Sequence, residues 1–275
     1  MESNNFYMGG MIDFQDDVNI LRKNKEYGCM ESKSVSFIYD YTDDRLKELE
    51  QKYELRLAAG TGDEFIQMLK ITYKIAQILN PGPSPQIPSF HALEILEKSQ
   101  DGFRSNCFLC ATVLTECFLA MGYAARMVRC MPIDLRFQEC HCVVAALVKK
   151  YNKFIVFDPA MGGCYLDEAG VPMGLHELRN AYLENRNYRI RSIFKLDQER
   201  IKKYFVKNLV RFQSYQTSRY GNEIKGTFKT MINLNPISMP MSDKLHLSEE
   251  GSTDQVFTYD ANQFWSIDNI VKVVS

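Results

Sequence analysis

The segment from Cys107 to Met121 constrains the fold more than any other part of the chain. Its sequence, CFLCATVLTECFLAM, is apolar on almost every side of a helix. Such a helix has no polar face to turn toward water, so it belongs in a protein interior. Gly122 follows it and predicts its end. The 275 residues, enough for one large domain or two small ones, can bury a sizeable core around it.

The elements around this helix predict an α+β protein. Helices come first, then the apolar helix, then a series of strands, then more helix and strand, which is segregated rather than alternating order. Apolar spacing and capping residues predict further helices at 41–60, 63–79, 91–100, 175–184 and 197–213. Valine-rich or alternating runs predict strands at 123–130, 141–148, 154–158, 227–234 and 255–259.

Cys107 stands where the apolar helix begins. Ser105 or Asn106 can cap that helix. A thiol at a helix N-terminus meets unsatisfied amides and the positive end of the helix dipole, and both favour the reactive thiolate. The same amides can stabilise an oxyanion on a substrate carbonyl. The alternative is a buried structural cysteine, which is the commoner role of a free cysteine.

His141 and Asp158 lie on two predicted strands that a short turn connects. If Val148 pairs with Tyr151, the antiparallel register puts His141 directly opposite Asp158, and a slip of one or two residues leaves them diagonal neighbours. A carboxylate there can accept the imidazole N–H, fix its tautomer and stabilise its cation. A core histidine and a plain strand-ending turn are the alternatives.

These motifs together resemble the transglutaminase-like superfamily. The cysteine that opens a core helix, the glycine that ends it and the alanine-arginine pair of the next strand match Cys107, Gly122 and Ala125-Arg126. The segment ECHCVVAALVKKYNKFIVFDPA, residues 139–160, is similar to the family's histidine strand and its aspartate strand ending in Asp-Pro. Family members often carry an aromatic residue after the histidine, where this chain has Cys142.

The resemblance covers roughly residues 88–190 and implies a papain-like core, with a central cysteine-bearing helix on an antiparallel sheet. Around a transglutaminase-like catalytic core at 86–190, we expect an N-terminal helical region at 1–85 and a C-terminal part of helix and strands at 191–275 packed on the same domain. The proline-rich segment 80–89 can be a linker or a surface strap.

The implied activity is acyl transfer through a thioester, with Cys107 as nucleophile, His141 as base and Asp158 orienting the histidine. We expect hydrolysis of a peptide, protein or small amide substrate, with no cofactor. An amine-accepting transglutaminase and a non-catalytic binding protein with the same fold are the alternatives. The candidates for a side-chain oxyanion donor are Gln100, Ser105 and Asn106.

A zinc site is a rival interpretation, because Cys140, His141, Cys142 and Cys164 lie close in sequence. Successive strand residues point to alternate faces, however, and the usual C-x₂₋₄-C spacing is missing. We therefore expect no metal.

Charge and composition limit the partners. There are 33 basic and 34 acidic residues, which predicts no general attraction to nucleic acid or to anionic membranes. The sequence shows neither a secretory signal nor an apolar run long enough to span a membrane. Seven of the eight cysteines fall between residues 107 and 164, mostly inside apolar runs, which favours reduced thiols in a cytoplasmic protein.

Overall fold

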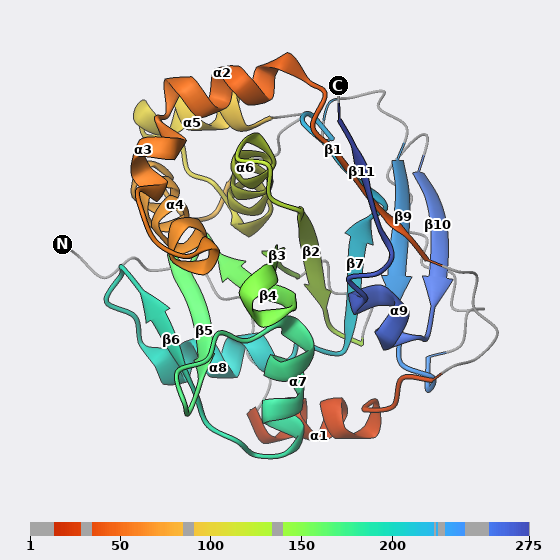
Figure 1. Ribbon diagram of the computed structural model, residues 1–275. Helices are drawn as coiled ribbons and strands as arrows, with labels where there is room; N and C mark the ends of the chain where they lie inside the picture. Colours follow the sequence, from red (N-terminus) through yellow and green to blue (C-terminus); the bar gives the residue numbers. More distant parts are fainter. Residues whose placement is uncertain are drawn as a thin grey trace.

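The structure, a computed structural model, describes residues 14–28, 35–84, 91–133, 140–222, 224, 229–239 and 253–274. It is an α+β protein in which helices pack around a large mixed sheet (Figure 1). The large sheet has eight strands in the order β10-β9-β7-β2-β3-β4-β5-β6. All neighbours are antiparallel except β9 and β10. The strands are β2 (Ala125–Met131), β3 (His141–Val148), β4 (Lys153–Asp158), β5 (Gly163–Asp167), β6 (Tyr188–Ser192), β7 (Arg211–Tyr215), β9 (Lys229–Leu234) and β10 (Thr253–Thr258).

A second, smaller sheet joins distant parts of the chain. Its strands β1 (Phe37–Asp40), β8 (Thr217–Ser218) and β11 (Ile270–Val273) pair in parallel, with β1 in the middle. Buried Arg126 of β2 links this sheet to the large one. Its guanidinium donates to the Tyr39 hydroxyl at 3.0 Å and to the Phe264 carbonyl of α9 (Ala261–Trp265) at 2.7 Å.

Apart from α9, the helices form two groups (Figure 1). In one group, the apolar helix predicted from the sequence, α6 (Cys107–Ala120), has four helices around it. These are α2 (Asp44–Lys52), α3 (Leu55–Ala59), α4 (Glu64–Ile78) and α5 (Ala92–Gln100). The other consists of α1 (Phe14–Lys23), α7 (Leu175–Leu183) and α8 (Gln198–Val206). Aspartate or asparagine caps several of these helices by accepting a first-turn amide, as Asp63 does from the Ile66 amide at 3.0 Å. No helix among the described residues is both long and apolar enough to cross a membrane.

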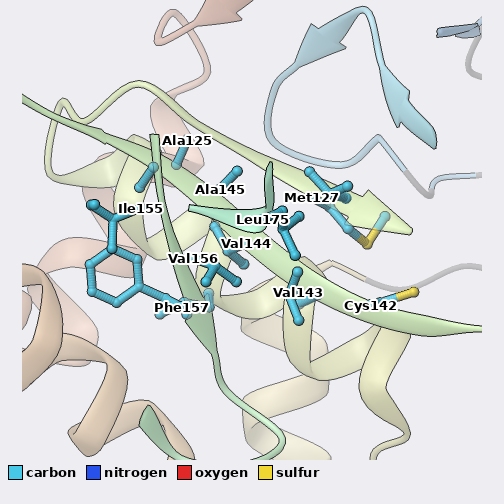
Figure 2. Packing of buried hydrophobic residues seen from close by; sticks show 14 of the residues in the cluster. Ala125, Met127, Cys142, Val143, Val144, Ala145, Ile155, Val156, Phe157 and Leu175 are labelled. Carbon is cyan, nitrogen blue, oxygen red and sulfur yellow. The ribbon is translucent and has the colours of Figure 1, made fainter. Parts of the chain in front are cut away.

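Helix α6 lies in the core, as its sequence predicts. Every residue from Leu109 to Leu119 is buried. The helix packs against β2 and β3, whose alanine and valine side chains leave room for it (Figure 2). Asn106 begins the helix, because its side-chain oxygen accepts the Leu109 amide at 3.0 Å. Because the rest of α6 is buried on all sides, its first residue, Cys107, is held in a defined position.

Two predicted helices are wrong in extent. The predicted helix 41–60 is two helices, because Glu54 takes a left-handed conformation (φ 49°) between α2 and α3. The predicted helix 197–213 ends at Val206, and residues 211–215 form β7 instead. Ladder bonds of β7 to β2 and to β9 outweigh the helical periodicity of that segment. Residues 85–90 of the proline-rich segment, and 227–228 at the start of a predicted strand, lie outside the described residues.

The register of the β3–β4 hairpin also differs from the prediction. The turn takes four residues, a short 3-10 helix at Lys149–Tyr151 followed by Asn152 in the left-handed region (φ 51°). Val148 therefore pairs with Lys153 rather than with Tyr151. The ladder shifts by two residues, so His141 and Asp158 are not directly opposed. They are the diagonal neighbours that a two-residue slip leaves.

Candidate functional site

His141 and Asp158 share one face of the large sheet, away from α6. Phe157 points toward α6, where its ring lies 5.2 Å from that of Phe118, so the next residue, Asp158, points to the other side. His141 packs there against α8, with its ring 5.1 Å from the ring of Phe205. Both polar side chains are fully buried. A buried polar pair of this kind needs internal partners.

Asp158 holds the histidine through a short hydrogen bond. His141 Nε2 lies 2.6 Å from Asp158 Oδ2. The Tyr165 hydroxyl donates to the same oxygen at 2.7 Å, and the Met161 amide donates to Oδ1 at 3.0 Å. Burial, followed by the nearby carboxylate, raises the pKa of Tyr165 well above its usual range, so the phenol stays protonated and remains a donor. Both carboxylate oxygens are thus fixed, and they fix the imidazole.

Cys107 lies at the N-terminus of α6 and is half-buried. Its Sγ is 3.7 Å from the Cys140 carbonyl oxygen, just before β3 begins. Hydrogen bonding with Cys142 lowers the pKa of the Cys107 thiol most, and interaction with His141 lowers it further. These effects outweigh burial, which acts in the opposite direction, so the pKa falls well below the usual range of a thiol.

The pKa of His141 moves the other way. Burial alone lowers it, but the charge and hydrogen bond of Asp158, together with Cys107, outweigh burial and raise the pKa to about 10. A low thiol pKa beside a high imidazole pKa favours a thiolate next to an imidazolium. The site can therefore supply a nucleophile and a proton donor side by side at neutral pH.

Two more thiols lie beside Cys107, and sequence reasoning assigned them no role there. Cys140 Sγ and Cys142 Sγ are 3.9 Å apart. Hydrogen bonds to Cys107 and Cys140, together with burial, raise the pKa of Cys142 well above its usual range. Cys142 therefore stays a thiol and can donate to the Cys107 thiolate. The sequence shows only that Cys142 directly follows His141, and that position does not predict the contact with Cys107.

The remaining cysteines of α6 behave differently. Burial raises the pKa of Cys110 and of Cys117 well above the usual range of a thiol. All seven described cysteines are free. Position at the helix start, together with the histidine, therefore separates Cys107 from its neighbours on the same helix.

The three candidates for an oxyanion donor lie in different environments. Asn106 uses its side-chain oxygen to cap α6, Ser105 is fully buried, and Gln100 is exposed at the end of α5. Tyr165 was not anticipated, because residues 163–167 were not predicted to be a strand. The aromatic ring is recognisable as part of the site only once β5 is placed beside β4.

The residues considered for zinc do not converge. Cys164 pairs with Phe157 on β4, which faces α6, whereas His141 points to the opposite face. Among the described residues, no three histidine, cysteine, aspartate or glutamate side chains are grouped so that they could hold a metal ion.

Comparison with known proteins adds little. No protein-family model matches the chain, and no curated protein is similar to it. One solved structure that matches is described as a candidate cysteine protease from Cytophaga hutchinsonii. It is 18% identical, with a TM-score of 0.34, and the match covers 54% of this chain and 46% of that one, so less than half of the other protein is spanned. A likeness this low assigns neither a fold nor an activity.

Proposed function

We propose that the protein is a cysteine-dependent enzyme that hydrolyses an amide or peptide bond through a thioester. The observation that carries this proposal is the buried His141–Asp158 pair, joined at 2.6 Å, beside a cysteine at a helix N-terminus. Cys107 is the nucleophile, His141 moves the proton and Asp158 orients the histidine. This division of labour needs one nucleophile, one base and one group that orients the base.

The first half of the reaction forms the thioester. The Cys107 thiolate attacks the carbonyl carbon, and the negative charge moves to the carbonyl oxygen near the backbone amides at the N-terminus of α6. Nε2 of His141 is hydrogen-bonded to Asp158. The proton therefore passes from Nδ1 to the leaving nitrogen, the C–N bond breaks, and an amine departs from a neutral imidazole.

The second half regenerates the enzyme. Neutral His141 takes a proton from water, and the hydroxide so formed attacks the thioester carbonyl. The C–S bond breaks, a carboxylic acid leaves, and the thiolate–imidazolium pair returns. An amine in place of water would make the protein a transglutaminase, but that route requires a second binding site protected from water. Hydrolysis is therefore the simpler proposal, and it uses no cofactor.

The same proposal assigns the three segments of the chain. Residues 86–190 carry the helix and the strands of the site, and the segments 1–85 and 191–275 support them. Two contacts favour this division: α4 packs on α6, and the rings of Tyr204 and Phe205 in α8 lie 5.5 and 5.1 Å from that of His141. We also propose that α6 and the large sheet form a papain-like core.

Labelling with an iodoacetamide-type probe tests the nucleophile. We expect wild type to be labelled at Cys107 near pH 6, Cys107→Ala to lose that labelling, and Cys110→Ala, one turn along the same helix, to keep it. Equal labelling of wild type and Cys107→Ala would overturn the assignment. Screening peptides with and without added amines then separates hydrolysis from amine transfer.

A further inference from the structure

Three thiols lie together at the start of α6. Cys107 is hydrogen-bonded to the thiol of Cys142, and Cys142 Sγ lies 3.9 Å from Cys140 Sγ. Cys107 Sγ is also 3.7 Å from the Cys140 carbonyl oxygen. Hydrolysis through a thioester needs one sulfur nucleophile, so it does not by itself require the other two thiols. These three residues are called the thiol cluster.

The alternation of β3 turns Cys142 toward α6. His141 packs against α8 on one face of the sheet, so the next residue, Cys142, points to the opposite face, which α6 covers. Cys142 lies there among the other buried side chains of β3 (Figure 2). Cys107 is the first residue of α6. A disulfide needs its two sulfurs about 2 Å apart, and thiols that already share a hydrogen bond have only a short distance to close.

Exposure and charge decide which thiol of the pair reacts first with an oxidant. Cys107 is half-buried, whereas Cys142 is fully buried, so a small oxidant reaches Cys107 first. The lowered pKa of Cys107 favours the thiolate, which is the form that peroxides oxidise, and the raised pKa of Cys142 keeps that sulfur protonated. Cys110 and Cys117 are fully buried with raised pKa values, so neither competes.

We propose that Cys107 is a site of reversible oxidation, where a hydroperoxide forms a sulfenic acid and Cys142 then closes a Cys107–Cys142 disulfide. The disulfide occupies the nucleophile, so oxidation switches the enzyme off. This regulatory effect rests on the proposed function, but formation of the disulfide does not. A sulfenic acid with no thiol beside it is open to further, irreversible oxidation. Cys142 protects the nucleophile from that loss by trapping it as a disulfide that a reductant can reopen.

The two steps balance with the hydroperoxide as the oxidant. The Cys107 thiolate attacks the terminal peroxide oxygen, the S–O bond forms and the O–O bond breaks. The departing alkoxide or hydroxide takes the proton of the His141 imidazolium, and the two electrons lost by sulfur reduce the peroxide. The Cys142 sulfur then attacks the Cys107 sulfur, the S–O bond breaks, and the departing hydroxide takes the Cys142 proton to become water. A dithiol reverses the product by thiol–disulfide exchange.

Treatment of the full chain with hydrogen peroxide, followed by tryptic digestion without reductant and mass spectrometry, tests the inference. We expect a link between the tryptic peptides 105–126 and 137–149, with fragment ions that assign it to Cys107 and Cys142. The rate of Cys107 alkylation by iodoacetamide should fall at least about tenfold after peroxide and return to within about twofold after dithiothreitol. Irreversible oxidation of Cys107 without the link, or no oxidation of Cys107, would overturn the inference.

Variants of the other cysteines identify the resolving thiol. In Cys142→Ser, peroxide should add oxygen to Cys107 without forming the link, and alkylation should stay at least about tenfold lower after dithiothreitol. Cys142→Ala carries the same test if the serine variant does not fold. Cys140→Ser, and Cys110→Ser one turn along α6, are the matched controls and should keep both the link and its reversal. A link from Cys107 to Cys140 instead would show that Cys142 is not the resolving thiol.

The outcomes for the two proposals are separable. If peroxide forms the link and Cys107→Ala keeps wild-type turnover of an amide substrate found by peptide screening, the proposed enzyme function fails and the oxidation site stands. If Cys107→Ala loses turnover but peroxide forms no link in wild type, the function stands and only the oxidation site is wrong.

Discussion

Two buried carboxylates, Asp158 and Glu116, show how partners decide what an acid can do. Glu116 lies in the middle of α6 and accepts the backbone amides of Ala92 at 2.7 Å and Gly221 at 2.9 Å. One carboxylate oxygen of Asp158 accepts a hydrogen bond from the Met161 backbone amide. The other oxygen accepts from the Tyr165 hydroxyl and is hydrogen-bonded to His141 Nε2. Asp158 contacts an imidazole, whose charge can change, whereas these two contacts of Glu116 are to backbone amides, whose charge cannot.

The difference separates architecture from chemistry. Backbone amides keep their protons, so Glu116 pins the start of α5 and the turn at Gly221 to the core helix. An imidazole gains and loses a proton, so the charge of Asp158 sets the pH at which His141 does so. Substitution of Glu116 should therefore be seen mainly in the free energy of unfolding, and substitution of Asp158 mainly in reaction rate.

Asp158→Asn should have the largest effect. Asparagine keeps the size of the side chain but cannot stabilise the imidazolium, and its amide group can hold the wrong tautomer of His141. We expect turnover of an amide substrate found by peptide screening to fall about 10⁴-fold, as in a triad that loses its acid. Steady-state kinetics measure this, with denaturation curves to show that the protein remains folded.

Asp167→Asn is the matched control. Asp167 also ends a strand and bonds a backbone amide, that of Val171 at 2.8 Å, but it does not contact His141 in the described structure. It should lose less than about twofold in turnover, as expected for a surface substitution. Asp158→Asn that keeps more than a tenth of wild-type turnover would contradict the role of Asp158.

Glu116→Gln should give the reverse result. The amide nitrogen of glutamine cannot accept a hydrogen bond, so either the Ala92 or the Gly221 amide loses its acceptor in a buried place. We expect the free energy of unfolding to fall by about 1–3 kcal/mol. Chemical denaturation measures this change. Turnover of the folded protein should stay within about twofold of wild type, and a larger loss would mean that Glu116 also acts on the site.

Much of the fold near the site could be predicted because it rests on local patterns. The all-apolar segment predicted that α6 is buried, and β3 runs from His141 to Val148 as its valine-rich run indicates. Residues 211–215 were misassigned because strand pairing with β2 and β9 decides their structure, and no local pattern reveals those partners. The sequence of 149–152 was also compatible with a shorter turn than the one that forms.

The site was predictable only in part, for the same reason. Cys107, His141 and Asp158 carry sequence signals, namely a helix start, a polar ring on an apolar strand and a strand-ending Asp-Pro. Tyr165 carries none, because a tyrosine on a strand is ordinary until its neighbours are known. Its contact with Asp158 follows from how β5 is placed beside β4.

The pH dependence of turnover should reflect the shifted pKa values of Cys107 and His141. It should also show that Glu116, unlike Asp158, does not influence them. Below the lowered pKa of Cys107 the sulfur is protonated, so activity is lost on the acid side, well below the usual thiol range. As pH rises through about 10, His141 loses its proton and the acid for the leaving group disappears. Turnover should fall about tenfold for each further pH unit.

A pH–rate profile of wild type and Glu116→Gln measures these limits. Glu116→Gln should keep both limbs in place, because that side chain contacts neither group in the described structure. Asp158→Asn should move the alkaline limb to lower pH, because the carboxylate no longer supports the imidazolium. An alkaline limb that stays near pH 10 in Asp158→Asn would show that another group stabilises the imidazolium.

Tyr165→Phe should lower the rate much less than Asp158→Asn, and it tests whether partners of Asp158 matter beyond His141. The phenol donates to the oxygen that also takes the imidazole, and phenylalanine keeps the ring against Phe205, 5.3 Å away. Loss of the donor leaves Asp158 less firmly oriented, so we expect turnover to fall about threefold to tenfold. Tyr188→Phe is the control, since its hydroxyl bonds Tyr182 instead. Equal effects of the two variants would assign the Tyr165 hydroxyl to packing alone.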